Sequence, residues 1–162
     1  MSDTSVIPGA LQVRNLFEDL LGRDVTVTPG QPLVIDDLPT AVVAVFVDAG
    51  HQIYGVIGMQ LSLAANAGAA LGLMPAGAAE DAVADKQLNP TIAENVGELC
   101  NVLTSLLNRE GGPHVKLHQV VYPGTQLPTD VQAHLMAMGR RLDLMIEVSR
   151  YGKGKLSLSL AP

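Results

Sequence analysis

The sequence predicts a single domain of the α+β class, an antiparallel β-sheet with two long helices packed on one face. Two observations predict this class. Segments with a hairpin pattern lie before and after a pair of helical segments, an order typical of an antiparallel sheet that carries helices. The 162 residues are 48% hydrophobic and 16% charged, which suits one globular core, so the domain is expected to span residues 1–162.

A helix and a short strand are predicted to begin the fold. Residues 10–22 place five apolar side chains at helical spacing, and Gly22 can end that helix. The apolar positions are Val13, Leu16, Phe17, Leu20 and Leu21. Residues 24–30 alternate like a short strand that closes in a Pro-Gly turn.

A β-hairpin is predicted to follow. Residues 41–47 are an apolar, β-branched first arm, residues 48–51 are the turn, and a second arm covers about 52–61. Gly55 and Gly58 in the second arm indicate a bulge or the close approach of another part of the chain.

Two helices with a connector between them are predicted next. Residues 62–74 form an Ala-rich helix that Pro75 and Gly77 stop. The small and polar residues of 76–90 are expected to be a connector with at most one helical turn. Residues 91–109 have the periodicity of a second, stronger helix.

The remaining chain is predicted to supply further strands. Residues 114–123 have a strand pattern, and residues 129–139 have a weak helical one. The closing segment is a hairpin in which apolar residues alternate on both sides of a turn at 151–154. Those residues are Leu142, Leu144, Ile146 and Val148 on one arm and Leu156, Leu158 and Leu160 on the other.

The 91–109 helix has one apolar side that is expected to pack on the sheet. Thr91 and Glu94 have capping-box spacing, and Pro90 disfavours helix at the residue before it, so the helix is expected to start here. The apolar stripe recurs at steps of four and three through Ile92, Val96, Leu99, Leu103 and Leu106.

The opposite side of this helix is a polar stripe whose only charges are negative. It consists of Glu94, Glu98, Asn101, Ser105 and Asn108, again at steps of four and three. Solvated helix faces usually mix Glu with Lys or Arg, and short amides and Ser are poor residues for a helix interior. The stripe therefore favours contact with a partner, although an ordinary solvated face remains an alternative.

Glu98 and Asn101 lie close enough on the helix to serve one patch. A carboxylate can pair with a lysine ammonium, and an amide can accept and donate hydrogen bonds at once, as the positioning of a water molecule requires. The pair is not a general acid/base dyad, and no activated nucleophile accompanies it.

These residues resemble the CheC/CheX/FliY family of chemotaxis phosphatases, and its CheX-like members in particular. The active helix of that family carries a glutamate and, three residues later, an asparagine, with a proline a little over twenty residues further along; here these are Glu98, Asn101 and Pro123. The stretches "LFEDLLGRDVTV", "IYGVIGMQLSL" and "EVSRYGKGKLSLSL" are similar to the opening helix and strand, the Gly-punctuated strand and the closing hairpin of the family. The Ala-rich helix of residues 62–74 has Asn66 but no matching glutamate, as in single-site members.

The resemblance implies a mechanism and a partner. Glu98 would anchor the active-site lysine of a phosphorylated CheY-like receiver domain, and Asn101 would position the water that attacks the phosphoaspartate. Glu94, Ser105 and Asn108 would contact the partner. The chain would need no metal or cofactor of its own, because the receiver supplies Mg²⁺. The resemblance also implies a homodimer.

Two alternatives stay open. Glu94 stands where the family often has Asp or Ser, and Cys100 and Ser105 have no match in its pattern, so a receiver-binding or scaffold module without hydrolysis fits as well. A structural homodimer whose polar stripe faces water is the third possibility. Whether the chain is an enzyme is therefore uncertain, and the resemblance favours a hydrolase.

Composition argues against several other classes. The net charge of −6 repels phosphate backbones, and two Phe, three Tyr and no Trp leave few stacking surfaces for bases, so nucleic-acid binding is not expected. The longest apolar stretch, residues 61–79, is too rich in Ala and Gly for a membrane span, and residues 1–13 lack a signal-peptide pattern. We expect a cytoplasmic protein. Cys100 is the only cysteine, which excludes an internal disulfide.

The histidines and arginines outside the stripe are predicted to lie at the surface, and the cysteine is predicted to be buried. His114 and His118 would stand about 13 Å apart along a strand, too far to share a metal ion. Arg140 and Arg141 are predicted to be solvated residues at the start of the last hairpin. Cys100 is expected to be a small buried thiol.

Overall fold

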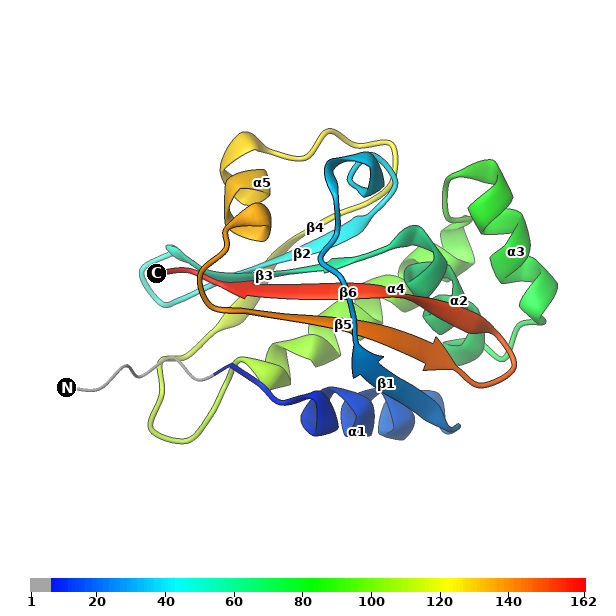
Figure 1. Ribbon diagram of the computed structural model, residues 1–162, viewed down its shortest axis with the longest axis horizontal. Coiled ribbons are helices and arrows are strands. Elements are labelled where there is room, and N and C mark those ends of the chain that lie inside the picture. Colours follow the sequence, from blue (N-terminus) through cyan, green and yellow to red (C-terminus); the bar gives the residue numbers. More distant parts are fainter. Residues whose placement is uncertain (1–6) are drawn as a thin grey trace.

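Residues 7–162 are described by the computed structural model, and they form a six-stranded antiparallel β-sheet (Figure 1). The order of strands across the sheet is β1-β5-β6-β3-β2-β4, and every neighbouring pair is antiparallel. The strands are β1 (Val25–Pro29), β2 (Val42–Val47), β3 (Ile53–Met59), β4 (Lys116–Val121), β5 (Arg141–Val148) and β6 (Gly152–Leu160). The predicted fold class is confirmed.

Helices cover both faces of the sheet. The helices α1 (Ala10–Leu21), α2 (Leu61–Leu71) and α4 (Pro90–Leu103) share one buried apolar cluster with the sheet. The short helix α5 (Thr129–Met136) and residues 30–41, which include the 3-10 turn η1 (Ile35–Asp37), cover the opposite face. The two long helices predicted for one face are confirmed, and α1 lies beside them.

The burial of β2 on both faces explains its sequence. Val42, Ala44 and Phe46 belong to the cluster under α2 and α4, whereas Val43 and Val45 belong to the cluster under α5. Successive side chains of a strand point to opposite faces, so a strand covered on both sides reads as a continuous apolar run.

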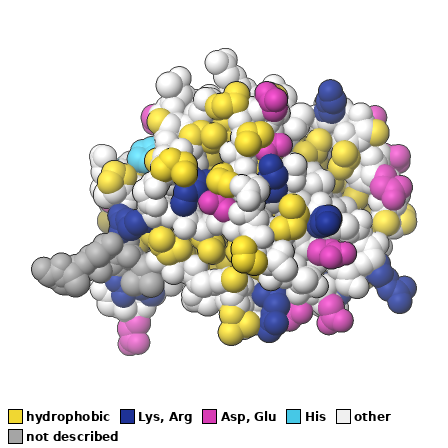
Figure 2. All heavy atoms as spheres, viewed as in Figure 1, with side chains coloured by type: hydrophobic (Ala, Val, Ile, Leu, Met, Phe, Trp, Pro, Cys, Tyr) yellow, Lys and Arg dark blue, Asp and Glu magenta, His cyan; other side chains and the backbone are white. Residues whose placement is uncertain are grey.

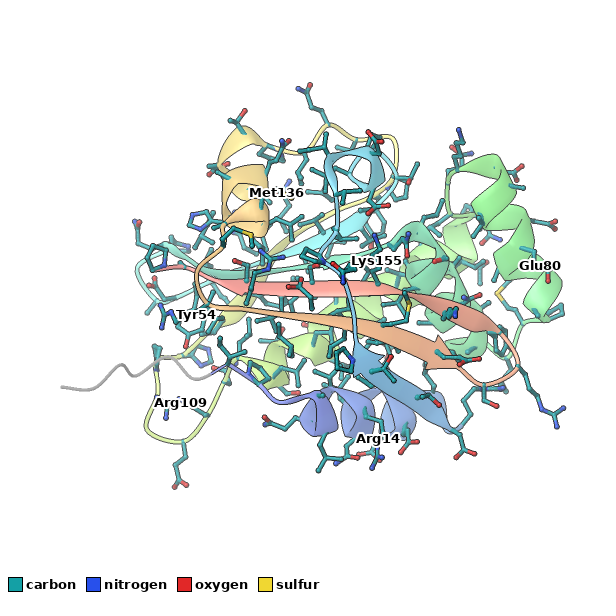
Figure 3. The ribbon with its side chains drawn as sticks, in the orientation of Figure 1. Arg14, Tyr54, Glu80, Arg109, Met136 and Lys155 are labelled. Atoms are coloured by element: carbon teal, nitrogen blue, oxygen red, sulfur yellow. The ribbon has the colours of Figure 1, made fainter. Side chains whose placement is uncertain are left out.

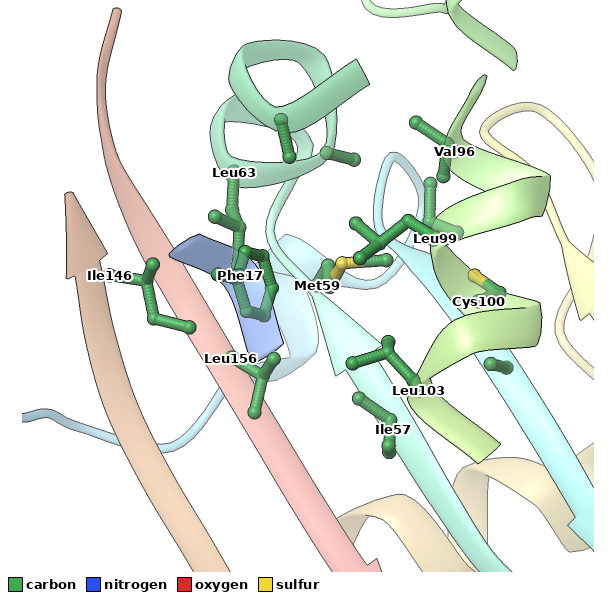
Figure 4. Close-up of a cluster of buried hydrophobic side chains, with 14 of the residues drawn as sticks. Phe17, Ile57, Met59, Leu63, Val96, Leu99, Cys100, Leu103, Ile146 and Leu156 are labelled. Carbon is green, nitrogen blue, oxygen red and sulfur yellow. The ribbon is translucent and has the colours of Figure 1, made fainter. Parts of the chain in front are cut away.

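The large core cluster links the helices to the middle of the sheet (Figure 4). Phe17 of α1 lies between Leu63 of α2 and Leu156 of β6, and all three are fully buried. From α4, Leu99 and Leu103 point toward the β3 side chains. The apolar stripe predicted for the 91–109 helix is therefore confirmed for its first four positions; Leu106 is half-buried.

The face under α5 is held by polar contacts as well. The Lys155 Nζ of β6 lies 3.4 Å from Asp37 Oδ2, and the Gln60 Nε2 donates to Asp37 Oδ1 at 3.4 Å (Lys155 is labelled in Figure 3). Figure 2 shows this face, on which cationic and anionic side chains are interspersed among apolar ones. Arg141 is not solvated as predicted, because it binds Asp143 at 2.8 Å and 2.9 Å and also donates to backbone carbonyls.

Residues 76–90 are not the connector that the sequence pattern predicts. They contain the ten-residue helix α3 (Ala76–Asp85), which packs on α2 and ends at Lys86 in the left-handed conformation. Only Ala79 and Ala82 of α3 are buried, so the helix has no stripe of large apolar residues that a periodicity argument could detect.

Several predicted boundaries are also wrong. The helix α2 ends at Leu71 and not at 74. The helix α4 ends at Leu103 and continues as the 3-10 turn η2 (Thr104–Leu106), short of the predicted 109. The last hairpin turns at residues 149–151, ahead of the predicted 151–154. Met138, expected on a helix, lies beyond α5 and is exposed.

The glycines predicted to mark close approaches do so. A Cβ on Gly58 would lie 2.7 Å from Leu33 Cδ1, and one on Gly55 would lie 3.1 Å from Leu160 Cδ2. The register of β2 and β3 also shifts between Phe46 and Val47, so both a bulge and close packing occur in this hairpin. Among residues 7–162, no helix is long and apolar enough to cross a membrane.

Candidate functional site

The helix α4 begins with a side-chain cap. Asn89 is extended, and its Oδ1 accepts a hydrogen bond of 2.8 Å from the Ile92 N–H, while Pro90 occupies the first helical position. This arrangement satisfies one of the free N–H groups of the first turn, and Pro has none to satisfy. The N-cap is therefore Asn89, two residues before Thr91, and the predicted capping box of Thr91 and Glu94 is wrong.

The exposed side of α4 carries the predicted polar stripe. Glu94, Glu98, Asn101 and Ser105 are exposed, and the side chain of Ser105 donates to the Val102 carbonyl at 2.9 Å. Within residues 7–162, the side chains of Glu94, Glu98 and Asn101 have no hydrogen-bond or ion-pair partner. An exposed carboxylate and an exposed amide are thus left available one helical turn apart.

Asn108 does not share this exposure. Because α4 tightens into η2 at Thr104, the helical spacing that places Asn108 on the stripe ends before it. Its side chain accepts from the Val115 N–H at 2.8 Å and donates to the Val115 carbonyl at 2.7 Å. Asn108 therefore closes the loop between α4 and β4 and is engaged within the fold.

One flank of the stripe is formed by Tyr122, which the sequence patterns do not single out. Its hydroxyl donates to the Ala93 carbonyl of α4 at 3.3 Å. A Cβ on Gly97 would lie 2.8 Å from that hydroxyl, so the glycine allows the contact. Burial raises the pKa of the Tyr122 hydroxyl, and the nearby Cys100 adds to the effect. The sequence signal for this contact is Gly97, a lone glycine inside an otherwise strong helix.

Tyr122 also brings Pro123 to the vicinity of α4. Pro123 follows Tyr122, two residues after the end of β4, and is half-buried. The other flank of α4 faces α2, where the Asn95 Nδ2 donates to the Gly68 carbonyl at 3.0 Å. The stripe is thus bounded by β4 on one side and by α2 on the other.

Cys100 is buried, as predicted, although it neighbours Asn101 in sequence. Its side chain is fully enclosed, and burial raises the pKa of the thiol from 9.0 to about 12. A thiol in this state is protonated and a poor nucleophile. It therefore takes no part in the chemistry of the exposed stripe.

The His, Cys, Asp and Glu side chains of the described chain do not gather at one point. Among residues 7–162, no group of three or more His, Cys, Asp and Glu side chains is arranged to hold a metal ion. His114 and His118 are both exposed, as predicted, and His114 precedes β4.

The geometry of α4 suits recognition of a cation beside a bound water. Glu98 can accept hydrogen bonds from an ammonium group, and Asn101 can both donate to and accept from water. Both side chains stand on a rigid helix whose other side is buried in the core. Such an arrangement can dock onto a partner and position one small molecule against it.

Comparisons with known proteins place the fold. No model of a known protein family matches the chain, and no curated protein sequence matches it. A chain of the FliM–SpeE complex from H. pylori is similar over 93% of this chain and 80% of its own, with a TM-score of 0.64 at 9% identity. CheX from Vibrio vulnificus is similar over 99% of this chain and 100% of its own, with a TM-score of 0.58 at 15% identity.

A third similar structure is that of the CheX–CheY–BeF3–Mg²⁺ complex from Borrelia burgdorferi. It covers 91% of this chain and 92% of its own, with a TM-score of 0.56 at 11% identity. FliY and FliM middle domains are also similar. At these identities the comparisons establish the fold, which is the one shared by CheX, FliY and the FliM middle domain.

Proposed function

We propose that this protein is a phosphatase of response-regulator receiver domains, which docks through α4 and hydrolyses the phosphoaspartate. The observation that carries the proposal is the exposed, unpartnered pair Glu98 and Asn101 on a rigid helix of a CheX-like fold. A similar structure was solved in complex with CheY, beryllofluoride and Mg²⁺, which supports a CheY-like partner.

The proposed reaction divides its parts between two proteins. The receiver supplies the phosphoaspartate, the Mg²⁺ and an active-site lysine, and Glu98 pairs with that lysine. Asn101 enters the receiver site and holds a water in line with the phosphorus. The water oxygen bonds to phosphorus as the bond to the aspartate oxygen breaks, which leaves a free carboxylate and inorganic phosphate. Catalysis here is positioning plus electrostatics, so the chain needs no nucleophile of its own.

Glu94 and Ser105 extend the proposed contact along the same stripe. Glu94 adds a second carboxylate toward the start of α4, and Ser105 lies one turn beyond Asn101. We propose that the protein acts as a homodimer in the cytoplasm, where receiver domains are found. Sedimentation equilibrium would test the dimer.

A second candidate is a scaffold that binds partners without hydrolysis. It is favoured by the FliM chains among the similar structures, two of which were solved in complexes with SpeE and FliG. Both candidates use an exposed helix face, and they differ in whether Asn101 speeds phosphate loss.

The test is phosphate release from each receiver domain of the same genome, phosphorylated by a small acyl phosphate. Wild type is expected to accelerate release from at least one receiver. Asn101→Ala should lower kcat by about 100-fold, since a group that positions the attacking water acts only in the transition state. Glu98→Ala should raise the Kd of the receiver about tenfold, because an exposed charged contact is lost.

The matched control is Glu80→Ala, an exposed glutamate on α3 (labelled in Figure 3). It removes the same charge from α3, outside the polar stripe of Glu94, Glu98, Asn101 and Ser105, and should change neither kcat nor Kd. If Asn101→Ala matches wild type, the hydrolytic role is refuted. Stable binding of a phosphorylated receiver without faster phosphate loss would establish the scaffold instead.

A further inference from the structure

A surface groove lies between α1 and the carboxyl-terminal end of α4, directly beside the polar stripe. The groove is open to solvent, and its volume is about 570 Å³. Its floor is apolar and half-buried, and consists of Leu16 and Leu20 from α1 with Val102 and Leu106 from α4 and η2.

The rim of the groove is polar and carries one charge. Gln12, Asn15 and Asp19 of α1 face Ser105 across it, and all four are exposed. Among residues 7–162, no Lys or Arg lines the groove. Arg14, the nearby cation of α1, lies 3.9 Å from Glu18 in an ion pair and donates to Asn15 Oδ1 of the rim at 3.4 Å (Arg14 is labelled in Figure 3). The groove therefore combines an apolar floor with a negative edge.

The groove continues the proposed docking surface. Ser105 belongs to both, and Val102 follows Asn101 in the chain. Val102 stands about one turn after Glu98, a distance of about 6 Å along the helix axis. A partner that contacts Glu98 and Asn101 is thus one turn away from the groove floor.

The stripe alone lacks what a stable interface needs. Its side chains are polar or charged, and exposed charges contribute more to association rate and specificity than to affinity. Affinity is concentrated in a few apolar or aromatic side chains that fill desolvated pockets at the interface. The groove is the adjoining surface that can accept such a side chain.

We propose that the receiver domain which docks on α4 inserts into this groove an apolar side chain flanked by a lysine or arginine. The inference rests on the proposed receiver-binding function and adds the second contact that fixes affinity and partner choice. Leu16, Leu20, Val102 and Leu106 would enclose the apolar group, and Asp19 would pair with the cation. The carboxylates of Asp19, Glu94 and Glu98 make the combined surface mainly negative, since Arg14, the cation beside it, is paired with Glu18, and this complements a basic partner face.

The experiment measures binding of the receiver domains of the same genome, activated with beryllofluoride and Mg²⁺. Leu20→Gln removes apolar floor, and Asp19→Lys reverses the charge of the rim. Each is expected to raise the Kd about tenfold for the receiver that wild type binds. The effect of Asp19→Lys should shrink as salt is raised from 50 to 500 mM, since exposed charges are screened.

Two controls match these changes elsewhere on the surface. Ile35→Gln removes an exposed apolar side chain from a separate cleft beside α5, and Glu80→Lys reverses a charge on α3. Both should bind the receiver as wild type does. Circular dichroism checks that all four variants are folded.

A second measurement avoids variants altogether. Methyl NMR spectra of wild type with the activated receiver should shift the signals of Leu16, Leu20, Val102 and Leu106. The methyl groups of Leu38 and Leu127, in the cleft beside α5, should stay unchanged.

The outcomes separate the two proposals. Unchanged Kd for both groove variants and unshifted groove methyls overturn the groove proposal, even where Asn101→Ala still abolishes hydrolysis. If wild type does not speed phosphate loss but the groove variants still weaken receiver binding, the groove proposal is upheld. The phosphatase proposal is then refuted. If the groove variants instead dissociate a homodimer and leave receiver binding intact, the occupant is a second copy of the chain and the proposal is wrong. Failure of wild type to bind any receiver refutes both.

Discussion

The helices α2 and α4 pack on the same face of the sheet but present opposite kinds of surface. In α2, every residue from Leu63 to Ala70 is buried, and Asn66 is only 7% exposed. In α4, the inner side is buried as fully, while Glu94, Glu98 and Asn101 face outward. The difference shows that a polar residue on a helix becomes available to a partner only where the fold leaves that side uncovered.

Helices and strands together cover α2. The helices α1, α3 and α4 and the strands β3, β5 and β6 all pack against it. Asn66 lies under Gly152 of the closing hairpin, where a Cβ would be 3.0 Å from its Nδ2. Even with a glutamate three residues earlier, Asn66 would stay buried, because α2 is covered where that residue lies.

The largest effect is expected where α2 meets the sheet. A Cβ on Gly154 of β6 would lie 2.5 Å from the Leu63 N and 2.8 Å from Leu63 Cβ, and the backbone cannot move aside. We expect Gly154→Ala to lower the free energy of unfolding by about 3 kcal/mol, as overpacking does. Urea denaturation would measure it. The control is Gly77→Ala on α3, where a Cβ would meet nothing within 4 Å and stability should hold or rise.

The second prediction tests whether the inner side of α4 is as closed as α2. Burial raises the pKa of Cys100 from 9.0 to about 12, so above pH 9 the unfolded chain loses a proton that the folded chain keeps. Stability is therefore fully retained below pH 9 and falls by up to about 1.4 kcal/mol per pH unit toward pH 12. Cys100→Ala lacks this loss. The difference in free energy of unfolding between wild type and Cys100→Ala should therefore shrink between pH 8 and 11. A constant difference would mean that the thiol is accessible.

The third prediction compares two asparagines of α4. Asn95 donates to Gly68 of α2, whereas Asn101 has no partner within residues 7–162. Both Asn→Ala changes gain the same helix propensity, so the difference between them reports the hydrogen bond and the packing of the half-buried Asn95 against α2. We expect Asn95→Ala to be about 1 kcal/mol less stable than Asn101→Ala. Equal melting temperatures would show that the contact with α2 contributes nothing.

The smallest effect on stability is expected on the exposed stripe. Glu94 and Glu98 are like charges one turn apart, and Glu98→Lys would turn them into a favourable pair. Thermal unfolding should show a gain of about 0.5 kcal/mol or less. Receiver binding should be lost in the same variant. A gain in stability with binding intact would mean that the stripe is an ordinary solvated surface.

Much of the fold follows from local patterns. Alternation in β1 and the last hairpin, the apolar run of β2 and the stripe of Ile92, Val96 and Leu99 predict strands and a helix close to their observed positions. The helix α3 was missed because it buries only small alanines, which produce little periodicity. The end of α4 was placed too late, because Leu106 continues the pattern through a turn that the backbone makes as a 3-10 helix.

The candidate site was predictable only in part. Helical spacing alone grouped Glu94, Glu98 and Asn101, and the structure finds each of them exposed. The same spacing included Asn108, whose side chain is bound to Val115 across a loop. Tyr122 reaches α4 from β4, and Leu16 and Leu20 approach Val102 from α1. No local pattern could show these contacts, because their partners are distant in the chain.

The sequence by itself determined the α+β class, the main strands and the polar stripe, since these depend on the periodicity of neighbouring residues. Only the tertiary structure decided that the stripe of α4 stays open while α2 is enclosed, and that a groove with an apolar floor adjoins it. Exposure is set by which elements pack together across the whole chain. A helix carries its polar residues in its sequence, but its neighbours decide whether a partner can reach them.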